Sequence, residues 1–398
     1  MERNQTYIVP GFTASGIAAG IKADGRTDLA LIRSDVPAVA AGVFTTNRFP
    51  AAPVQIDRER IARGAARAIL ANSGNANAAT GPDGLKDALA SSRELARRLA
   101  IPEHQILVAS TGVIGHRLPL EKILAGLPRL VADLSPEGIP AAEEAILTTD
   151  RFPKLAVART RCGGRDVTVC GLAKGAGMIE PHMATMLAFI LTDAVVLRDD
   201  LDRLFRRAVR STFNAISVDG CESTNDTALI LANGVAANRP IAARGADGRR
   251  FGAMLTEVMG QLARDMVEDG EGATKRVEIC VSGARTRAEA RRIAYAVARS
   301  NLVKTAFYGG DPNWGRIIAA AGSVGIALTA DRVTLHFEDV LMFADGQGRA
   351  PDPERIFAIM QQPIIRIRLE VAMGKAAFVL QTSDLTRDYV ALNAHYHT

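Results

Sequence analysis

A glycine-rich loop lies between two apolar runs in the segment Gly171-Leu-Ala-Lys-Gly-Ala-Gly-Met-Ile-Glu-Pro-His-Met-Ala-Thr-Met-Leu-Ala-Phe-Ile190. The residues at its start predict the end of a strand, and the apolar run that begins at Met186 predicts a second, buried strand. Pro181 prevents a helix from continuing between them. Thr185 is therefore expected where a conformationally permissive loop meets a rigid strand, which is a suitable position for a nucleophile.

The role of Thr185 has two interpretations when only composition and periodicity are considered. It could be an ordinary β-branched strand residue, because a Gly-x-Gly pair is a weak signal by itself. Alternatively, it is a nucleophile, which needs a base to accept the proton of its hydroxyl. The α-amino group of Thr185 would serve as that base if the chain were cut between Ala184 and Thr185.

The part of this segment from Lys174 to Leu187 resembles the signature of the ornithine acetyltransferase family, the bifunctional glutamate N-acetyltransferases of arginine biosynthesis. The resemblance implies that the precursor cleaves itself between Ala184 and Thr185, and that the new N-terminal threonine carries the acetyl group. Two residues depart from the family pattern, since Ala176 and His182 stand where Ser and Asn are expected.

This cleavage would divide the chain into an α chain of residues 1–184 and a β chain of residues 185–398. Further motifs occur in the same order as in the family, so that the resemblance extends from about Gly11 to Thr398. These motifs are Asn72-Ser-Gly-Asn-Ala-Asn77, Thr148-Thr-Asp150, Asp269-Gly-Glu-Gly272, Phe307-Tyr-Gly-Gly-Asp-Pro-Asn-Trp-Gly-Arg316 and Asn393-Ala-His-Tyr-His-Thr398.

A Thr-Gly pair, Thr111-Gly112, follows the strand expected at Gln105–Ala109. Such a pair at the end of a strand presents a hydroxyl and a backbone N–H side by side, which is the geometry that an oxyanion hole requires, although most such pairs are simple turns. The resemblance implies that Thr111 and Gly112 stabilise the tetrahedral intermediate.

The resemblance also implies a set of substrate contacts and leaves two questions about them open. It does not decide which of Thr148 and Thr149 contacts the substrate. It assigns no role to Cys221 and Glu222, because this chain departs from the family pattern there. The implied substrate-binding residues are Thr148, Thr149, Lys174, Thr185, Glu271, Asn393 and Thr398.

The function implied is acetyl transfer from N2-acetyl-L-ornithine to L-glutamate through an acetyl-threonine intermediate, in a ping-pong cycle without a cofactor. Whether acetyl-CoA also serves as a donor is left open. A related self-cleaving amidohydrolase or aminopeptidase with an N-terminal nucleophile would use the same threonine and admit water. An uncut amino-acid-binding protein is the non-catalytic alternative.

Length and composition set broader expectations. A chain of 398 residues is too long for one simple core and predicts two lobes or more. A net charge of +5 with only 5% aromatic residues does not indicate a nucleic-acid-binding protein. We find neither a signal peptide nor a transmembrane run, and the four cysteines show no metal-ligand spacing with the histidines. We therefore expect a cytoplasmic enzyme without a metal, assembled as an α2β2 heterotetramer.

The periodicity predicts an α/β (α+β) fold with layered sheets and flanking helices. The resemblance implies that this architecture is of the ornithine acetyltransferase type, that of self-cleaving proteins with an N-terminal nucleophile. A turn is expected at Ser34-Asp35, and Asp199 is expected to cap a helix that runs to about Phe213. The other expected elements that matter below are strands at Ile17–Lys22, Leu29–Ile32 and Ala38–Phe44, and helices at Leu85–Leu99 and Thr286–Ser300.

Overall fold

The protein is described by a computed structural model that covers residues 6–180 and 186–395. These residues form two compact units. Unit 1 comprises the described parts of Met1–Asn214 and Cys221–Met266, and unit 2 comprises Ala215–Gly220 and the described part of Val267–Tyr396. The cut predicted between residues 184 and 185 lies within the sequence of unit 1. The division into compact units does not test whether this peptide bond is cut, so the cut stays a prediction.

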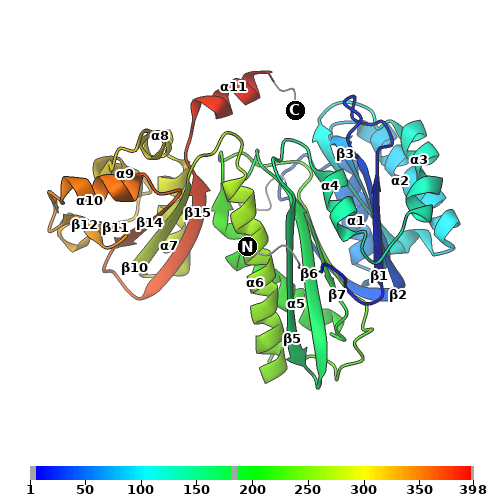
Figure 1. Cartoon of the computed structure of the whole chain (residues 1–398). Coiled ribbons are helices and arrows are strands. Elements are labelled where there is room, and N and C mark those ends of the chain that lie inside the picture. The colour runs from blue at the N-terminus through cyan, green and yellow to red at the C-terminus, as the bar shows by residue number, and fades with distance from the viewer. Residues whose placement is uncertain (1–5, 181–185, 396–398) are drawn as a thin grey trace. The chain divides into compact units, whose positions relative to one another are not determined.

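Unit 1 is built on one large sheet, which has eight strands among the described residues, in the order β4-β3-β2-β9-β7-β6-β5 with β1 paired to β2 (Figure 1). β3 runs parallel to β4 and β7 runs parallel to β9, whereas β2 runs antiparallel to both β3 and β9. The strands are β1 (Phe12–Ile17), β2 (Leu29–Phe44), β3 (Ala65–Asn75), β4 (Ile106–Val113), β5 (Lys154–Cys162), β6 (Arg165–Lys174), β7 (Leu187–Thr192) and β9 (Thr227–Ala232).

Helices cover both faces of this sheet. Leu29 and Leu31 of β2 belong to a core cluster that includes side chains of α1, α2 and α3, whereas Ala30 and Ile32 belong to a second cluster with α4. Successive strand residues point to opposite faces, so a strand covered on both faces must be apolar at every position. The helices are α1 (Ala52–Ile61), α2 (Gly81–Leu99), α3 (Leu120–Ala132), α4 (Ile139–Ile146), α5 (Arg198–Ser211) and α6 (Ala246–Glu268).

The turn expected at Ser34-Asp35 is wrong, because the two strands predicted on either side of it are one strand, β2. Its pairing with β3 shifts register between Arg33 and Ala38, which indicates a local irregularity and not a reversal of the chain. Polar residues in a strand therefore gave a false turn signal.

The strand expected at Ile17–Lys22 is also wrong, since the first strand ends at Ile17. Asp28 explains the loop that follows. Its buried carboxylate accepts hydrogen bonds from the backbone N–H groups of Ala19, Ile21 and Lys22 at 2.6–2.9 Å, which a strand would have directed to a neighbouring strand.

Two helix predictions had different outcomes. The helix expected from Thr286 is confirmed, and the Thr286 side chain accepts a hydrogen bond from the Glu289 N–H as its N-cap. The cap predicted at Asp199 is wrong, because helix α5 has Leu197 at the N-cap position and no side-chain cap. Asp199 lies instead in the first turn, where its charge still interacts favourably with the helix dipole.

Unit 2 contains a second sheet, which has seven strands among the described residues, in the order β13-β12-β11-β14-β10-β15-β8. The strands are β8 (Ile216–Ser217), β10 (Arg276–Ala284), β11 (Thr334–Phe337), β12 (Val340–Ala344), β13 (Gln347–Gly348), β14 (Ile364–Glu370) and β15 (Ala376–Ser383). The helices are α7 (Arg287–Arg299), α8 (Asn301–Gly309), α9 (Trp314–Gly322), α10 (Pro353–Met360) and α11 (Arg387–His395).

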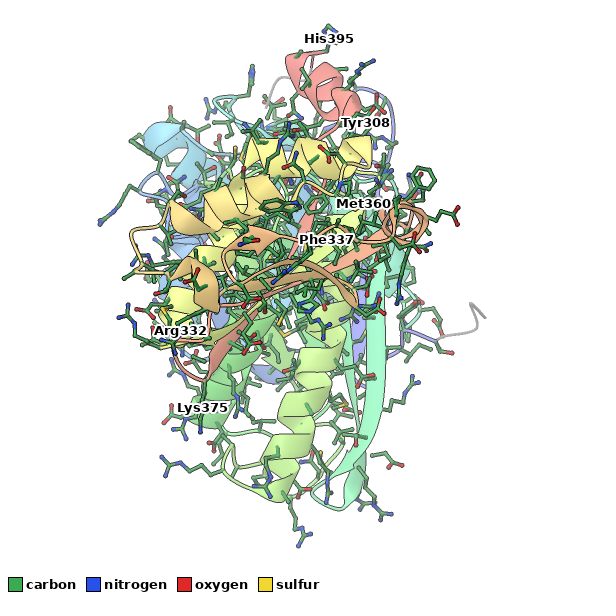
Figure 2. All side chains as sticks on the ribbon, turned by 90° about the vertical axis from the view of Figure 1, so that its left-hand side faces the viewer. Tyr308, Arg332, Phe337, Met360, Lys375 and His395 are labelled. Atoms are coloured by element: carbon green, nitrogen blue, oxygen red, sulfur yellow. The ribbon has the colours of Figure 1, made fainter. Side chains whose placement is uncertain are left out.

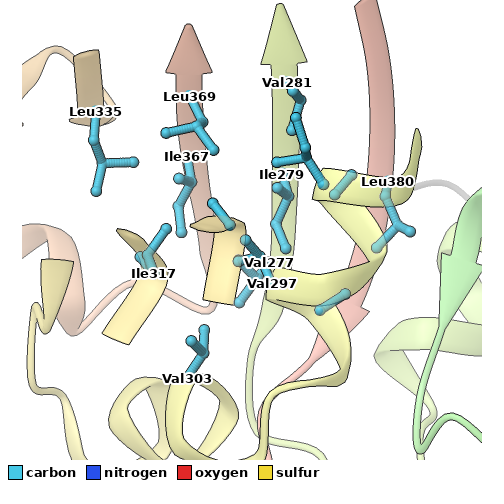
Figure 3. Packing of buried hydrophobic residues seen from close by; sticks show 14 of the residues in the cluster. Val277, Ile279, Val281, Val297, Val303, Ile317, Leu335, Ile367, Leu369 and Leu380 are labelled. Atoms are coloured by element: carbon cyan, nitrogen blue, oxygen red, sulfur yellow. The ribbon is translucent and has the colours of Figure 1, made fainter. Parts of the chain in front are cut away.

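One face of this second sheet is apolar and lies beneath helices. Side chains of β10, β14 and β15 meet Val297 of α7 and Ile317 of α9 (Figure 3). Along β14, buried and exposed residues alternate, so only one face of the strand packs against the helices. Figure 2 labels Phe337 and Met360, which are buried, and Lys375, which is exposed. The layered α/β architecture predicted from the sequence is confirmed.

Candidate active site

Thr111 and Gly112 lie where β4 ends beside β3. Ser73 pairs with Thr111 and Gly74 pairs with Gly112 in this parallel ladder, and Thr111 is only 3% exposed. Gly112 has a φ of +133°, and a Cβ atom there would lie 2.4 Å from the carbonyl carbon of Gly74. A glycine is therefore required at 112 for steric reasons, independently of any role of its N–H.

Lys174, the last residue of β6, brings three of the predicted site residues together. Its ammonium donates a hydrogen bond to Thr148 Oγ1 at 2.7 Å and contacts Thr111 Oγ1 at 3.5 Å. Its side chain is 3% exposed. Residues from β4, from the segment after α4 and from β6 thus meet within unit 1. Among the described residues, Thr149 contributes no side-chain hydrogen bond to this cluster.

Asp150 is the negative centre of the cluster. Its Oδ1 accepts hydrogen bonds from Lys154 Nζ and from the Gly175 N–H, each at 2.7 Å, and its Oδ2 lies 3.6 Å from Lys174 Nζ. The side chain is fully buried. Burial opposes its ionisation, but the ammonium groups of Lys174 and Lys154 outweigh this and hold the pKa of the Asp150 carboxyl well below its usual range. The cluster therefore contains a stable buried carboxylate between two cations.

Glu143 of α4 lies next to this cluster in a different protonation state. Its Oε1 accepts a hydrogen bond from the backbone N–H of Lys154 at 2.7 Å, and Oε2 has no hydrogen-bond partner in the described part of the chain. Burial raises the pKa of Glu143 to about 8. At neutral pH the Glu143 carboxyl is thus mainly protonated, while the nearby carboxyl of Asp150 is ionised.

Glu143→Gln should remove a pH dependence from the stability of the protein. In the unfolded chain Glu143 ionises near its ordinary pKa of 4.5, whereas in the folded chain it stays protonated up to about pH 8. Unfolding therefore releases a proton between these values, and stability falls as pH rises through this window. The loss is on the order of a few kcal/mol. Thermal midpoints at pH 5 and pH 8 measure it, and the variant should decline less than the wild type. Equal declines would contradict the buried protonated state.

Asn225 fixes the end of β4 beside Thr111. Its side-chain amide donates hydrogen bonds to the carbonyl oxygens of Ala76 and Ser110, at 2.6 and 2.8 Å. Ser110 in turn donates from its hydroxyl to Asn72 Oδ1 at 2.6 Å. All three side chains are buried, so Asn72 of β3, Ser110 of β4 and Asn225, which precedes β9, form a connected network next to the Thr-Gly pair.

Asp226 holds the start of β7. Its Oδ1 accepts a hydrogen bond from the backbone N–H of Met186 at 3.0 Å, and the Met186 carbonyl accepts from the Thr227 N–H. Asp226 is fully buried, and burial raises the pKa of its carboxyl well above the usual range. The residue that follows Thr185 is therefore anchored to β9.

Two further predicted substrate-binding residues meet in unit 2. Asn393 of α11 donates a hydrogen bond from its side-chain amide to Glu271 Oε2 at 2.8 Å, although the two residues are 122 positions apart in the sequence. Thr386 joins the same two segments, since its hydroxyl donates to the carbonyl oxygen of Gly272 at 2.8 Å. The terminal helix is thus attached to the turn that carries Glu271.

A family model described as the ArgJ family matches residues 13–398 of this chain. The chain belongs to the ArgJ family. It is 50% identical over 392 residues to the Arginine biosynthesis bifunctional protein ArgJ of Geobacter sulfurreducens, covering 98% of this chain and 100% of that protein. The protein of the same name from Syntrophotalea carbinolica is 45% identical over 391 residues and covers 98% of this chain and 99% of its own length. The family predicted from the signature at Lys174–Leu187 is confirmed.

A crystal structure of the ArgJ protein from Bacillus halodurans is also similar to this chain. It shares 33% identity and a TM-score of 0.51, and the match covers 52% of this chain and 98% of that one. An ornithine acetyltransferase from Mycobacterium tuberculosis, solved with ornithine, is 39% identical over 47% of this chain and 98% of its own, with a TM-score of 0.41.

Three of the residues that the ArgJ resemblance assigned lie outside the described residues. These are Ala184 and Thr185 at the predicted cleavage site, and Thr398 at the C-terminus. His182, one of the departures from the family pattern, also lies outside them. Cys221 and Glu222, the other departures, are exposed on the segment that leads to Asn225.

Sequence reasoning missed the charged residues that support the site. Asp150 was visible as the third residue of the Thr-Thr-Asp motif, yet only its threonines were assigned. Lys154 and Glu143 carried no signal, because charged residues near a turn or on a short helix are normally exposed.

Among the described residues, no helix is long and apolar enough to cross a membrane.

Proposed function

We propose that this protein transfers the acetyl group of N2-acetyl-L-ornithine to L-glutamate through an acetyl-threonine intermediate on Thr185. As a member of the ArgJ family it is an acyltransferase of arginine biosynthesis. The observation that carries the finer proposal is the cluster of Thr111, Thr148 and Lys174 at the end of β6. Lys174 pairs across the sheet with Leu187, and Thr185 precedes Leu187 by two residues in the sequence.

The chemistry begins with attack of the Thr185 hydroxyl on the acetyl carbonyl carbon of acetylornithine. The hydroxyl proton passes to the α-amine of Thr185, whose usual pKa of ~8 makes it an effective base near neutral pH. Thr111 and the Gly112 N–H stabilise the negative oxygen of the tetrahedral intermediate. The bond to the ornithine nitrogen then breaks, the nitrogen takes up the proton, and the acetyl group stays on Thr185.

The second half of the cycle reverses these steps with a different amine. The amino group of glutamate attacks the acetyl-threonine ester and loses its proton to the α-amine of Thr185. The bond between the acetyl carbon and the Thr185 oxygen then breaks, the proton returns from the α-amine to that oxygen, and N-acetylglutamate leaves. Both substrates carry an α-carboxylate. We assign Thr148, Thr149, Lys174, Glu271, Asn393 and Thr398 to substrate binding.

The active form requires a cut between Ala184 and Thr185, which releases the α-amine of Thr185. The solved ArgJ chain from Bacillus halodurans is matched over 98% of its length while covering 52% of this chain. Two chains of roughly equal length, as this cut would produce, account for that coverage. We further propose that the α and β chains assemble as α2β2 in the cytoplasm.

Purified protein incubated with acetylornithine and glutamate tests the function. The expected products are ornithine and N-acetylglutamate in equal amounts, with two bands of about half size on a denaturing gel. A parallel incubation with acetyl-CoA and glutamate determines whether a second donor is used. Release of acetate without N-acetylglutamate would contradict the proposal and indicate a hydrolase.

Asn393→Ala should lower kcat/KM for acetylornithine while leaving cleavage intact. The variant loses the hydrogen bond to Glu271, so a charged group at the proposed binding site loses its partner. Hydrogen bonds to charged groups contribute ~1.5–3 kcal/mol, which corresponds to a decrease of roughly tenfold or more. Initial rates and a denaturing gel measure the two properties separately. Unchanged rates would remove Asn393 from the site.

A further inference from the structure

The hydroxyl of Thr111 has only one way to interact with the ammonium of Lys174. An ammonium group has three N–H donors and no acceptor, so in the 3.5 Å contact Lys174 donates and Thr111 Oγ1 accepts. The hydroxyl hydrogen of Thr111 must therefore point elsewhere. In the described part of the chain, Thr111 Oγ1 donates to no acceptor. Its hydrogen is available for a ligand at the site.

Lys174 is held in place for this contact by groups other than a substrate. Thr148 Oγ1 accepts one of its hydrogen bonds at 2.7 Å, and Asp150 Oδ2 lies 3.6 Å away as the countercharge. Asp150 is itself fixed by Lys154 and by the Gly175 N–H. The Lys174 side chain is only 3% exposed. Its contacts with Thr148 and Asp150 therefore hold the ammonium beside Thr111 before any substrate binds.

We propose that Lys174 is a positioning residue of the oxyanion hole: its ammonium occupies the acceptor side of the Thr111 hydroxyl and directs the hydroxyl hydrogen to the developing oxyanion. This inference rests on the proposed function and changes the role of Lys174 within it, from substrate contact to polarisation of Thr111. A donor whose oxygen is bound by a cation is a stronger hydrogen-bond donor, because hydrogen bonds in a chain polarise one another.

Acylation by p-nitrophenyl acetate separates the two roles of Lys174. This ester delivers its acetyl group to the Thr185 hydroxyl and releases p-nitrophenolate, yet it has neither the carboxylate nor the amine of an amino acid. If Lys174 only binds the amino acid, Lys174→Gln should leave acylation by this ester unchanged. If Lys174 polarises Thr111, the variant should be acylated at least about tenfold more slowly, since the loss of one oxyanion donor costs ~10²-fold or more.

A double-mutant cycle with Thr111→Ala then tests whether Lys174 acts through Thr111. Lys174→Gln should slow acylation strongly when Thr111 is present and by less than about threefold when Thr111 is already alanine, because residues that act as one unit are not additive. Equal effects in both backgrounds, or normal acylation of the single variant, would overturn the inference and return Lys174 to substrate binding.

Lys154→Gln is the matched control, because it removes a lysine from the same carboxylate, Asp150, without a contact to Thr111. Its effect should combine additively with Thr111→Ala; a coupling as large as that of Lys174 would also count against the inference. If Lys174→Gln does not fold, Lys174→Arg, which retains a buried cation beside Asp150, takes its place in the cycle and should still couple to Thr111→Ala.

The same cycle measured with acetylornithine and glutamate should show the same coupling. If the wild type does not form N-acetylglutamate, only the proposed transferase function is refuted. The acylation cycle with p-nitrophenyl acetate would still decide the role of Lys174, so the two failures are distinguishable.

Discussion

Thr185→Ala is expected to yield a single uncut chain without transferase activity. Both steps need the same hydroxyl, since it attacks the preceding carbonyl during cleavage and the acetyl carbonyl during transfer. The alanine side chain offers no nucleophile, and without a cut no α-amine is released to act as base. A denaturing gel and the acetylornithine–glutamate assay measure the two losses.

The control for this prediction is Thr185→Ser, which retains a hydroxyl at the same position. We expect this variant to be cut, and to form N-acetylglutamate at a measurable rate. Two bands from the Thr185→Ala protein would show that cleavage does not depend on this side chain, and the assignment of Thr185 as the nucleophile would then be wrong.

Thr111→Ala is expected to lower kcat by about 10²-fold or more, as is usual when one oxyanion donor is removed. The KM for acetylornithine should change much less, because the hydroxyl acts on the charge that develops in the transition state. Steady-state rates over a range of acetylornithine concentrations measure both constants.

Thr111→Ser provides the comparison, because it retains the hydroxyl and should keep most of the turnover that Thr111→Ala loses. A large rise in KM at normal kcat would instead show that Thr111 binds the ground-state substrate. A loss of cleavage in Thr111→Ala would show that the same oxyanion hole serves the cut at Ala184.

Local sequence patterns predicted the elements whose signals are strong over a short range. The helix capped by Thr286 and the two apolar strands around Lys174 and Leu187 are where they were expected. The prediction was wrong where tertiary contacts decide the backbone. The Asp28 carboxylate accepts hydrogen bonds from the loop after β1. The pairing of Ser34 with Phe12 of β1, and the hydrogen bond from the Asp35 N–H to the Gly11 carbonyl, keep β2 extended through Ser34-Asp35.

The sequence by itself determined the family, through motifs in which residue identity matters at fixed spacing, and it determined which residues are candidates for the chemistry. Only the tertiary structure decided how those candidates meet. Lys174 contacts Thr111 across 63 positions, and Asn393 contacts Glu271 across 122. It also decided the charge states, with Asp150 ionised between two buried lysines and Glu143 protonated beside them. The physical reason is that burial and neighbouring charge set a pKa, and neither depends on the local sequence.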